Sequence, residues 1–72
     1  MKPLQLGNRL KVARAERNLS QEELATLAGV TRQTISSIET GQYCPSALLA
    51  CVLAKRLGKR FEELFFLLGE EP

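Results

Sequence analysis

The chain has 72 residues, of which 44% are hydrophobic and 25% are charged, and its formal net charge is +2. This composition is that of one soluble globular domain, small enough that association with a second copy would add to its stability. Two cysteines and no histidine exclude a four-ligand zinc site within one copy and remove the commonest general base. No apolar run reaches the roughly 20 residues that span a membrane, and no secretory signal opens the chain. We therefore expect a cytoplasmic protein with no metal or other cofactor.

Charged residues are unevenly distributed along the chain. Basic side chains dominate residues 1–20 and 41–60, whereas the charged side chains of residues 61–72 are all acidic. Such blocks fit a surface that contacts a polyanion, but they also occur on ordinary solvated faces. The predicted helices, and the residues on their faces, are needed to distinguish these two interpretations.

The first predicted helix runs from about Leu4 or Leu6 to Arg17. Apolar residues recur at helical spacing between Leu6 and Ala13. Asn18 then tolerates the left-handed conformation that closes a helix, so we expect the helix to end there.

The second and third predicted helices are joined by a tight turn. Ser20 and Glu23 have the spacing of a capping box, which predicts a helix start at Ser20, and Gly29 predicts its end. Thr31 is a suitable N-cap for a third helix over residues 32–40. Two helices joined by a turn of three or four residues are typical of a helix-turn-helix.

Two further helices complete the predicted domain. Ser46 begins a fourth helix that runs to Leu57, where Gly58 stops it. A short fifth helix covers about Phe61 to Leu67, although Arg60 stands where a capping side chain is expected. The sequence thus predicts an all-α domain of five helices over residues 1–72. Its helix-turn-helix occupies about 20–40, and a short helix and tail occupy 61–72.

The third predicted helix has two unlike faces. Ile35 and Ile38 form one narrow apolar stripe, and the remaining side chains can form hydrogen bonds. A helix in the major groove needs this division, because its back docks on the protein and its front matches base edges. Gln33 can pair bidentately with adenine, and Arg32 can pair with guanine or hold a phosphate. We predict a surface for double-stranded DNA made by Gln21, Arg32, Gln33, Thr34, Ser36, Ser37, Thr40 and Tyr43.

Three segments carry a family resemblance. Residues 19–25 (LSQEELA), 29–36 (GVTRQTIS) and 38–41 (IETG) resemble, in order and separation, the Cro and phage-repressor helix-turn-helix proteins, also called the XRE family. The resemblance extends from about Leu6 to Phe65. It implies a lambda-repressor-like fold, a nucleoid-associated transcriptional regulator, and operator binding as a homodimer. Two positions depart from the family pattern, because Cys44 replaces a common asparagine and Arg60 replaces a common serine or threonine.

The resemblance also implies roles for individual residues. The position of Gln21 clamps the DNA backbone in the family, and that of Thr34 commonly contacts a phosphate. The positions of Arg32, Gln33 and Ser37 face bases. A buried ion pair is implied between Arg14 and Glu39, and Glu39 needs such a partner because it follows the buried stripe. Tyr43 could either cover the edge of the core or reach a phosphate.

Apolar surface beyond one core stripe predicts a dimer. Residues 47–54 are apolar on every face of the fourth helix, and residues 65–68 add a further apolar run. The predicted homodimer contacts are Leu48, Val52, Phe65, Phe66, Leu67 and Leu68. The alternative is that Leu68 and the two phenylalanines fold back to cap a small core.

Other functions remain as alternatives. The apolar tail could serve an antitoxin-like interaction module that neutralises a protein partner and also binds DNA. An enzyme is not expected, because the sequence has no nucleophile–base arrangement and no glycine loop that would cradle phosphate. Cys44 and Cys51 are expected to be reduced thiols, and no small-molecule pocket is evident. The end of the chain after Gly69 favours a complete protein over part of a larger regulator.

Overall fold

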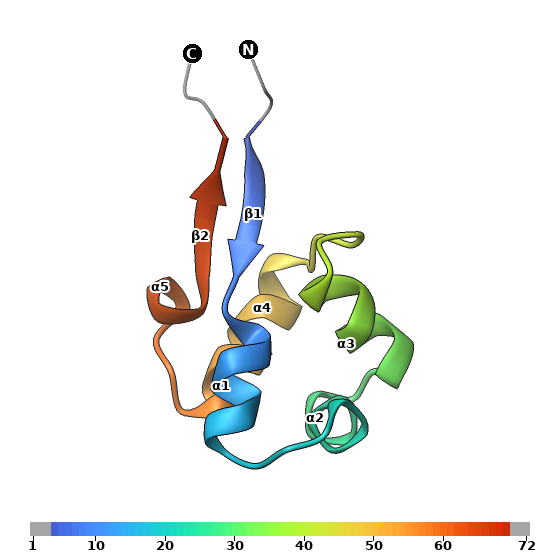
Figure 1. Cartoon of the computed structure of the whole chain (residues 1–72). Helices are drawn as coiled ribbons and strands as arrows, with labels where there is room; N and C mark the ends of the chain where they lie inside the picture. Colours follow the sequence, from blue (N-terminus) through green and yellow to red (C-terminus); the bar gives the residue numbers. More distant parts are fainter. Residues whose placement is uncertain (1–3, 70–72) are drawn as a thin grey trace.

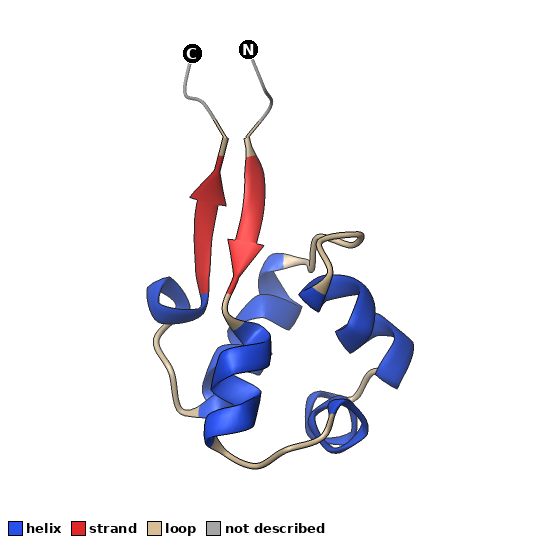
Figure 2. Cartoon of the chain, in the orientation of Figure 1, coloured by secondary structure: helices blue, strands red, loops and turns tan. Residues whose placement is uncertain are grey.

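The computed structural model describes residues 4–69, which form five helices and a two-stranded sheet (Figures 1 and 2). In chain order the elements are β1 (Gln5–Asn8), α1 (Leu10–Glu16), α2 (Gln21–Ala28), α3 (Arg32–Glu39), α4 (Ala47–Leu57), α5 (Phe61–Leu64) and β2 (Phe65–Leu68). The five predicted helices are confirmed, and the sheet is an addition to them. No helix in this part of the chain is long and apolar enough to cross a membrane.

Helices α2, α3 and α4 begin directly after the capping residues that the sequence marks. In the capping box of α2, the Glu23 N–H donates to Ser20 Oγ at 3.0 Å, and the Ser20 N–H donates to the Glu23 carboxylate at 2.8 Å. The bond from the Ser20 backbone lowers the pKa of Glu23 below its usual value. At the start of α5 the Glu63 carboxylate accepts from the Arg60 N–H at 2.7 Å. This bond partly replaces the capping side chain that Arg60 lacks.

The sheet joins the two ends of the described chain. β1 is antiparallel to β2, with Gln5 opposite Leu68 and Asn8 opposite Phe65. Figure 1 shows the sheet extending beyond the helices at one end of the molecule. Residues 5–8 and 65–67, predicted as parts of the first and fifth helices, are therefore strands. Each segment has so few apolar residues that their spacing fits both the period of a helix and that of a strand. The spacing within a segment also cannot reveal that it pairs with a segment at the other end of the chain.

Asn8 explains why α1 begins later than predicted. Its side-chain Oδ1 accepts from the Leu10 N–H at 3.1 Å, in the manner of a cap. Its Nδ2 donates to the Ile38 carbonyl at 2.9 Å, across 30 residues of sequence. Asn8 thus bonds to the first residue of α1, whose N-cap is Arg9, and ties the sheet to the last turn of α3.

The core lies where all five helices meet. It contains the buried side chains of Leu10, Ala13, Leu24, Ala25, Ile35, Ile38, Ala50, Leu53, Ala54, Leu57, Leu64 and Phe65. Phe65 is only 3% exposed, with its ring 5.2 Å from that of Phe61. This corrects its prediction as a surface contact and agrees with the fold-back alternative for that residue. Leu67 and Leu68 remain exposed, at 63% and 49%, and Phe66 is half-buried.

Replacement of Asn8 by alanine tests this link. The variant loses the bonds to Leu10 and Ile38, while the Ile38 carbonyl keeps its bond from the Gly41 N–H at 3.1 Å. We expect the free energy of unfolding to fall by about 1–3 kcal/mol, measured by urea denaturation. Lys11→Ala, at an exposed site on α1, is the control and should change stability little. Equal stability of the Asn8→Ala variant and the parent protein would contradict the proposed link.

Candidate nucleic-acid interface

The helix-turn-helix is built by α2, the turn after it and α3. Gly29 has a φ of +73°, in the left-handed region that glycine adopts without strain, and it ends α2. Thr31 then caps α3, because its side chain accepts from the Thr34 N–H at 3.2 Å. Only three residues, 29–31, separate the two helices. Their short connection fixes α3 against α2.

The structure separates the two faces of α3. Ile35 and Ile38 are buried in the core. Arg32 and Gln33 are exposed, and Thr34, Ser36 and Ser37 are half-buried beside them. The exposed face therefore presents guanidinium, amide and hydroxyl groups to solvent. These are the groups that match base edges and phosphate oxygens in a major groove.

An ion pair joins α1 to the end of α3. Arg14 Nε donates to Glu39 Oε2 at 2.9 Å, and its Nη2 donates to Oε1 at 3.3 Å. The two side chains are only 15% and 5% exposed. Arg14 also donates to the Leu19 carbonyl at 2.9 Å, which holds the segment before α2. The hydrogen bond to Glu39 raises the pKa of Arg14 above its usual value.

This ion pair continues into the predicted DNA-binding surface. Gln21 Nε2 donates to Glu39 Oε1 at 3.1 Å, so the first residue of α2 is held by the last residue of α3. Arg32 Nη1 donates in turn to Gln21 Oε1 at 3.3 Å. The sequence predicts each of these residues separately. It gives no sign that Glu39 bonds to Gln21, because the contact depends on how α2 crosses α3.

The other predicted residues lie on α3, at its C-terminal end or in the loop that follows it. Gln33 Nε2 donates to Ser37 Oγ at 3.2 Å, one helical turn further on. Thr40 Oγ1 donates to the carbonyls of Ser36 and Ser37, at 3.1 and 3.3 Å, and so closes the helix. Tyr43 lies in the loop after α3 and is 47% exposed, so its ring is not a core residue.

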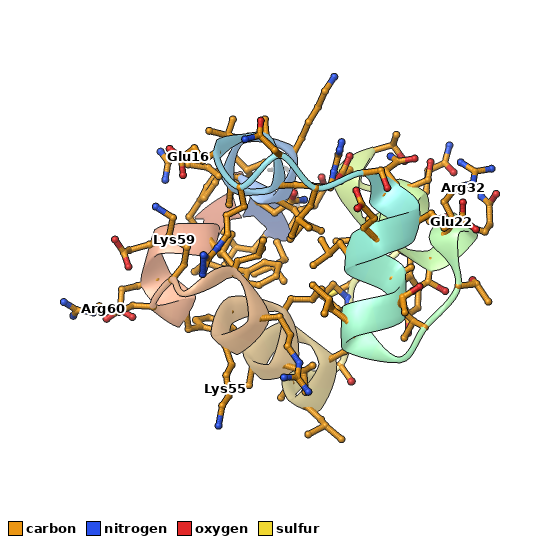
Figure 3. The ribbon with its side chains drawn as sticks, turned by 90° about the horizontal axis from the view of Figure 1, so that it is seen from below. Glu16, Glu22, Arg32, Lys55, Lys59 and Arg60 are labelled. Carbon is orange, nitrogen blue, oxygen red and sulfur yellow. The ribbon has the colours of Figure 1, made fainter. Side chains whose placement is uncertain are left out.

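The second basic block of the sequence lies elsewhere. Figure 3 shows Lys55, Lys59 and Arg60 on the side of the bundle away from Arg32. Lys59 pairs with Glu16 at 3.1 Å and Arg60 with Glu62 at 3.0 Å, both on the surface. These three side chains are therefore not part of the surface formed by α2 and α3, whereas Arg56 of the same block donates to the Leu27 carbonyl of α2 at 3.0 Å.

A double-mutant cycle tests the Arg14–Glu39 pair. Arg14→Ala or Glu39→Ala alone should lower the free energy of unfolding by roughly 3–5 kcal/mol, since each leaves a charge partly buried without its partner. The double variant should lose less than the sum of the single variants. The exposed pair of Lys59 and Glu16 is the matched control, with an expected coupling of about 0–1 kcal/mol. Strictly additive losses at positions 14 and 39 would show that the pair does not act as a unit.

Comparisons with known proteins agree with this geometry. The helix-turn-helix family model HTH_3 matches residues 10–64. An HTH-type transcriptional regulator of Methanocaldococcus jannaschii is 48% identical over 66 residues, which are 92% of this chain and 100% of that protein. The HTH-type transcriptional regulator YgzD of Bacillus subtilis is 45% identical over 62 residues, covering 86% of this chain and 94% of YgzD.

Solved structures show the same relationship. The restriction-modification controller protein C.AhdI of Aeromonas hydrophila superposes with a TM-score of 0.73 and 36% identity, over 76% of this chain and 80% of that one. The family model, these relatives and the arrangement of α2 and α3 agree with one another. The chain belongs to the XRE-type helix-turn-helix family of DNA-binding transcriptional regulators.

Proposed function

We propose that this protein is a repressor that binds an inverted-repeat operator as a homodimer. The observation that carries the proposal is the division of α3, with Ile35 and Ile38 buried and Arg32 and Gln33 exposed. In a dimer the two α3 helices would lie about 34–36 Å apart, one turn of DNA, so that each enters the major groove of one half-site. The protein then acts by occupying DNA, without catalysis and without a cofactor.

The contacts between side chains suggest distinct roles on DNA. Gln33 lies on the exposed face one turn before its bonded partner Ser37, and its amide matches the major-groove edge of adenine. Gln21, at the start of α2, is positioned to donate to a phosphate near the N-terminal N–H groups of that helix. Gln21 bonds to both Arg32 and Glu39. Glu39 would therefore help to position the phosphate contact of Gln21 and the base contact of Arg32.

The exposed face of α3 carries little charge, so few of its side chains can pair with phosphates. Arg32 is the one charged side chain of α3 on the exposed face, and it donates to Gln21. Affinity should fall steeply as the salt concentration rises, because contacts to phosphate release counterions. Sequence reading would then depend on the amide and hydroxyl groups rather than on general attraction to the polyanion.

Selection of bound duplexes from a random DNA pool tests this function, with the parent protein and with Gln33→Ala. The parent protein should enrich an inverted repeat at near-physiological salt. Gln33→Ala should lose about 1–3 kcal/mol of binding and relax the preference at one base position of each half-site. Lys55→Ala, on the far side of the bundle, is the control and should enrich the same site.

Two outcomes would contradict the proposal. An equal loss of affinity on all sequences would mean that Gln33 does not read a base. Salt-sensitive binding with no enriched sequence would favour an interaction module that meets DNA only with a protein partner.

A further inference from the structure

Three exposed cationic side chains lie around the C-terminal end of α4. Lys55 and Arg56 belong to the last turn of this helix, and Arg17, which follows α1, reaches the same end. Figure 3 shows Lys55 on the side of the bundle away from Arg32. We call Arg17, Lys55 and Arg56 the far-side cations, because they lie apart from the face of α3 that is assigned to the operator.

Arg17 is fixed at this end of α4 through only one of its nitrogen atoms. Its Nε donates to the Leu57 carbonyl at 3.1 Å. Leu57 is the last residue of α4, so its carbonyl has no partner within the helix. Gly58 leaves room for the guanidinium, since a Cβ atom there would lie 2.9 Å from Arg17 Nη2. The two Nη groups form no hydrogen bond with residues 4–69 and can donate to an external acceptor.

Arg56 is fixed in the same way on a different helix. Its Nε donates at 3.0 Å to the carbonyl of Leu27, which lies in the last turn of α2 just before Gly29 ends that helix. Its Nη groups also have no partner in the part of the chain that the structure describes. An arginine held through Nε has already lost much of its side-chain freedom, so an anion that binds its Nη groups costs less entropy. The two arginines are therefore pre-organised as anion donors.

The acidic side chains on the same side of the bundle are already paired. Glu16 forms a salt bridge with Lys59 at 3.1 Å. Glu62 forms one with Arg60 at 3.0 Å. Among residues 4–69, no carboxylate forms a salt bridge with a far-side cation. Three unpaired positive charges therefore lie on this side, whereas Arg32 is the one charged side chain on the exposed face of α3.

The dipole of α4 explains only part of this arrangement. The C-terminal end of a helix attracts cations, and Lys55 and Arg56 both lie in the last turn of α4. Arg56, however, bonds to α2 and not to its own helix. Capping of the two helix ends also uses only the Nε atoms of the arginines. The Nη groups and the Lys55 ammonium remain available for a ligand that carries several negative charges.

We propose that the far-side cations bind the phosphate backbone of a second DNA duplex while α3 occupies the operator. Guanidinium and ammonium groups donate to phosphate oxygens, and phosphate contacts carry no sequence information, so this surface takes DNA of any sequence. DNA is the polyanion that a DNA-bound protein meets at the highest local concentration. The protein would thus connect its operator to another DNA segment. This activity goes beyond the proposed repressor function, because it uses neither the face of α3 nor an inverted repeat.

Nuclear magnetic resonance of the full-length, ¹⁵N-labelled protein tests this second surface. The protein would first be saturated with the selected operator duplex and then titrated with a short duplex of unrelated sequence. We expect the second titration to shift the backbone signals of residues 55–59 and the Nε–H signals of Arg17 and Arg56. The signals of residues 32–37 should stay constant in this step, because the operator already covers them.

The salt dependence and a pair of charge-reversal variants test which side chains are involved. Between about 50 and 200 mM salt, three phosphate contacts should give a log–log slope of about −3 for the unrelated duplex. Lys55→Glu should weaken this second binding by roughly tenfold and leave operator binding unchanged. Lys11→Glu, at the opposite end of α1 from Arg17, changes the net charge equally and should affect the second binding little. Spectra of the free variants would show that both are folded.

Three outcomes would overturn the proposal. The unrelated duplex could leave the signals of the far-side cations unshifted, or Lys11→Glu could weaken the second binding as much as Lys55→Glu. Shifts caused by a poly-glutamate peptide but not by the duplex would indicate an acidic protein as the ligand. Failure of the operator duplex to shift α3 would instead reject the proposed function. The unrelated duplex, titrated into the free protein, would then still test the far-side cations.

Discussion

The contact between Arg14 and Glu39 is the constraint on which the DNA-binding surface depends. It is formed by two hydrogen bonds between side chains that are almost removed from solvent. Arg14 reaches back to the Leu19 carbonyl, and Glu39 accepts from Gln21. One carboxylate thus fixes the end of α3 against α1 and the start of α2. Loss of this carboxylate would release a partly buried guanidinium and the residue that holds Arg32, so we expect stability and DNA binding to be coupled at this point.

The C-terminal end of α3 is held from a second side by the sheet. Asn8 donates to the Ile38 carbonyl, immediately before Glu39 in the chain. The same turn of helix therefore receives one bond from β1 and an ion pair from α1. Such support matters because α3 is only eight residues long and is rich in serine and threonine, which are weak helix formers. Its geometry comes from tertiary contacts rather than from helix propensity.

Capping residues and apolar spacing predicted the central helices of this fold, but they did not predict the two strands near its ends. The caps at Ser20, Thr31 and Ser46 place three helix starts at the residues where the structure has them. Residues 5–8 and 65–68 form strands only because they pair across almost the whole chain, and a non-local pairing leaves no periodic pattern in four residues. The asparagine at position 8 is a helix-starting residue type, but the apolar spacing from Leu6 obscured this signal.

The candidate site was predicted residue by residue, but its connections were not. The exposed face of α3 follows from the two isoleucines, whose spacing defines the buried stripe. The bonds from Arg32 to Gln21 and from Gln21 to Glu39 depend on the crossing of α2 and α3, which no spacing rule supplies. Linear charge blocks were also a poor guide, because Lys55, Lys59 and Arg60 lie away from Arg32 (Figure 3). Side-chain chemistry on a defined helix face was more informative than net charge.

The central claim is that α3 reads base edges in the major groove. Base analogues placed singly in the selected site test it directly, with affinity measured for each. Replacement of a purine by its 7-deaza analogue removes a major-groove acceptor, whereas hypoxanthine in place of guanine removes only the minor-groove amino group. We predict that 7-deaza substitution at the base read by Gln33 weakens binding by about 1–3 kcal/mol and that hypoxanthine substitutions have little effect. The reverse pattern would show minor-groove reading and contradict this account.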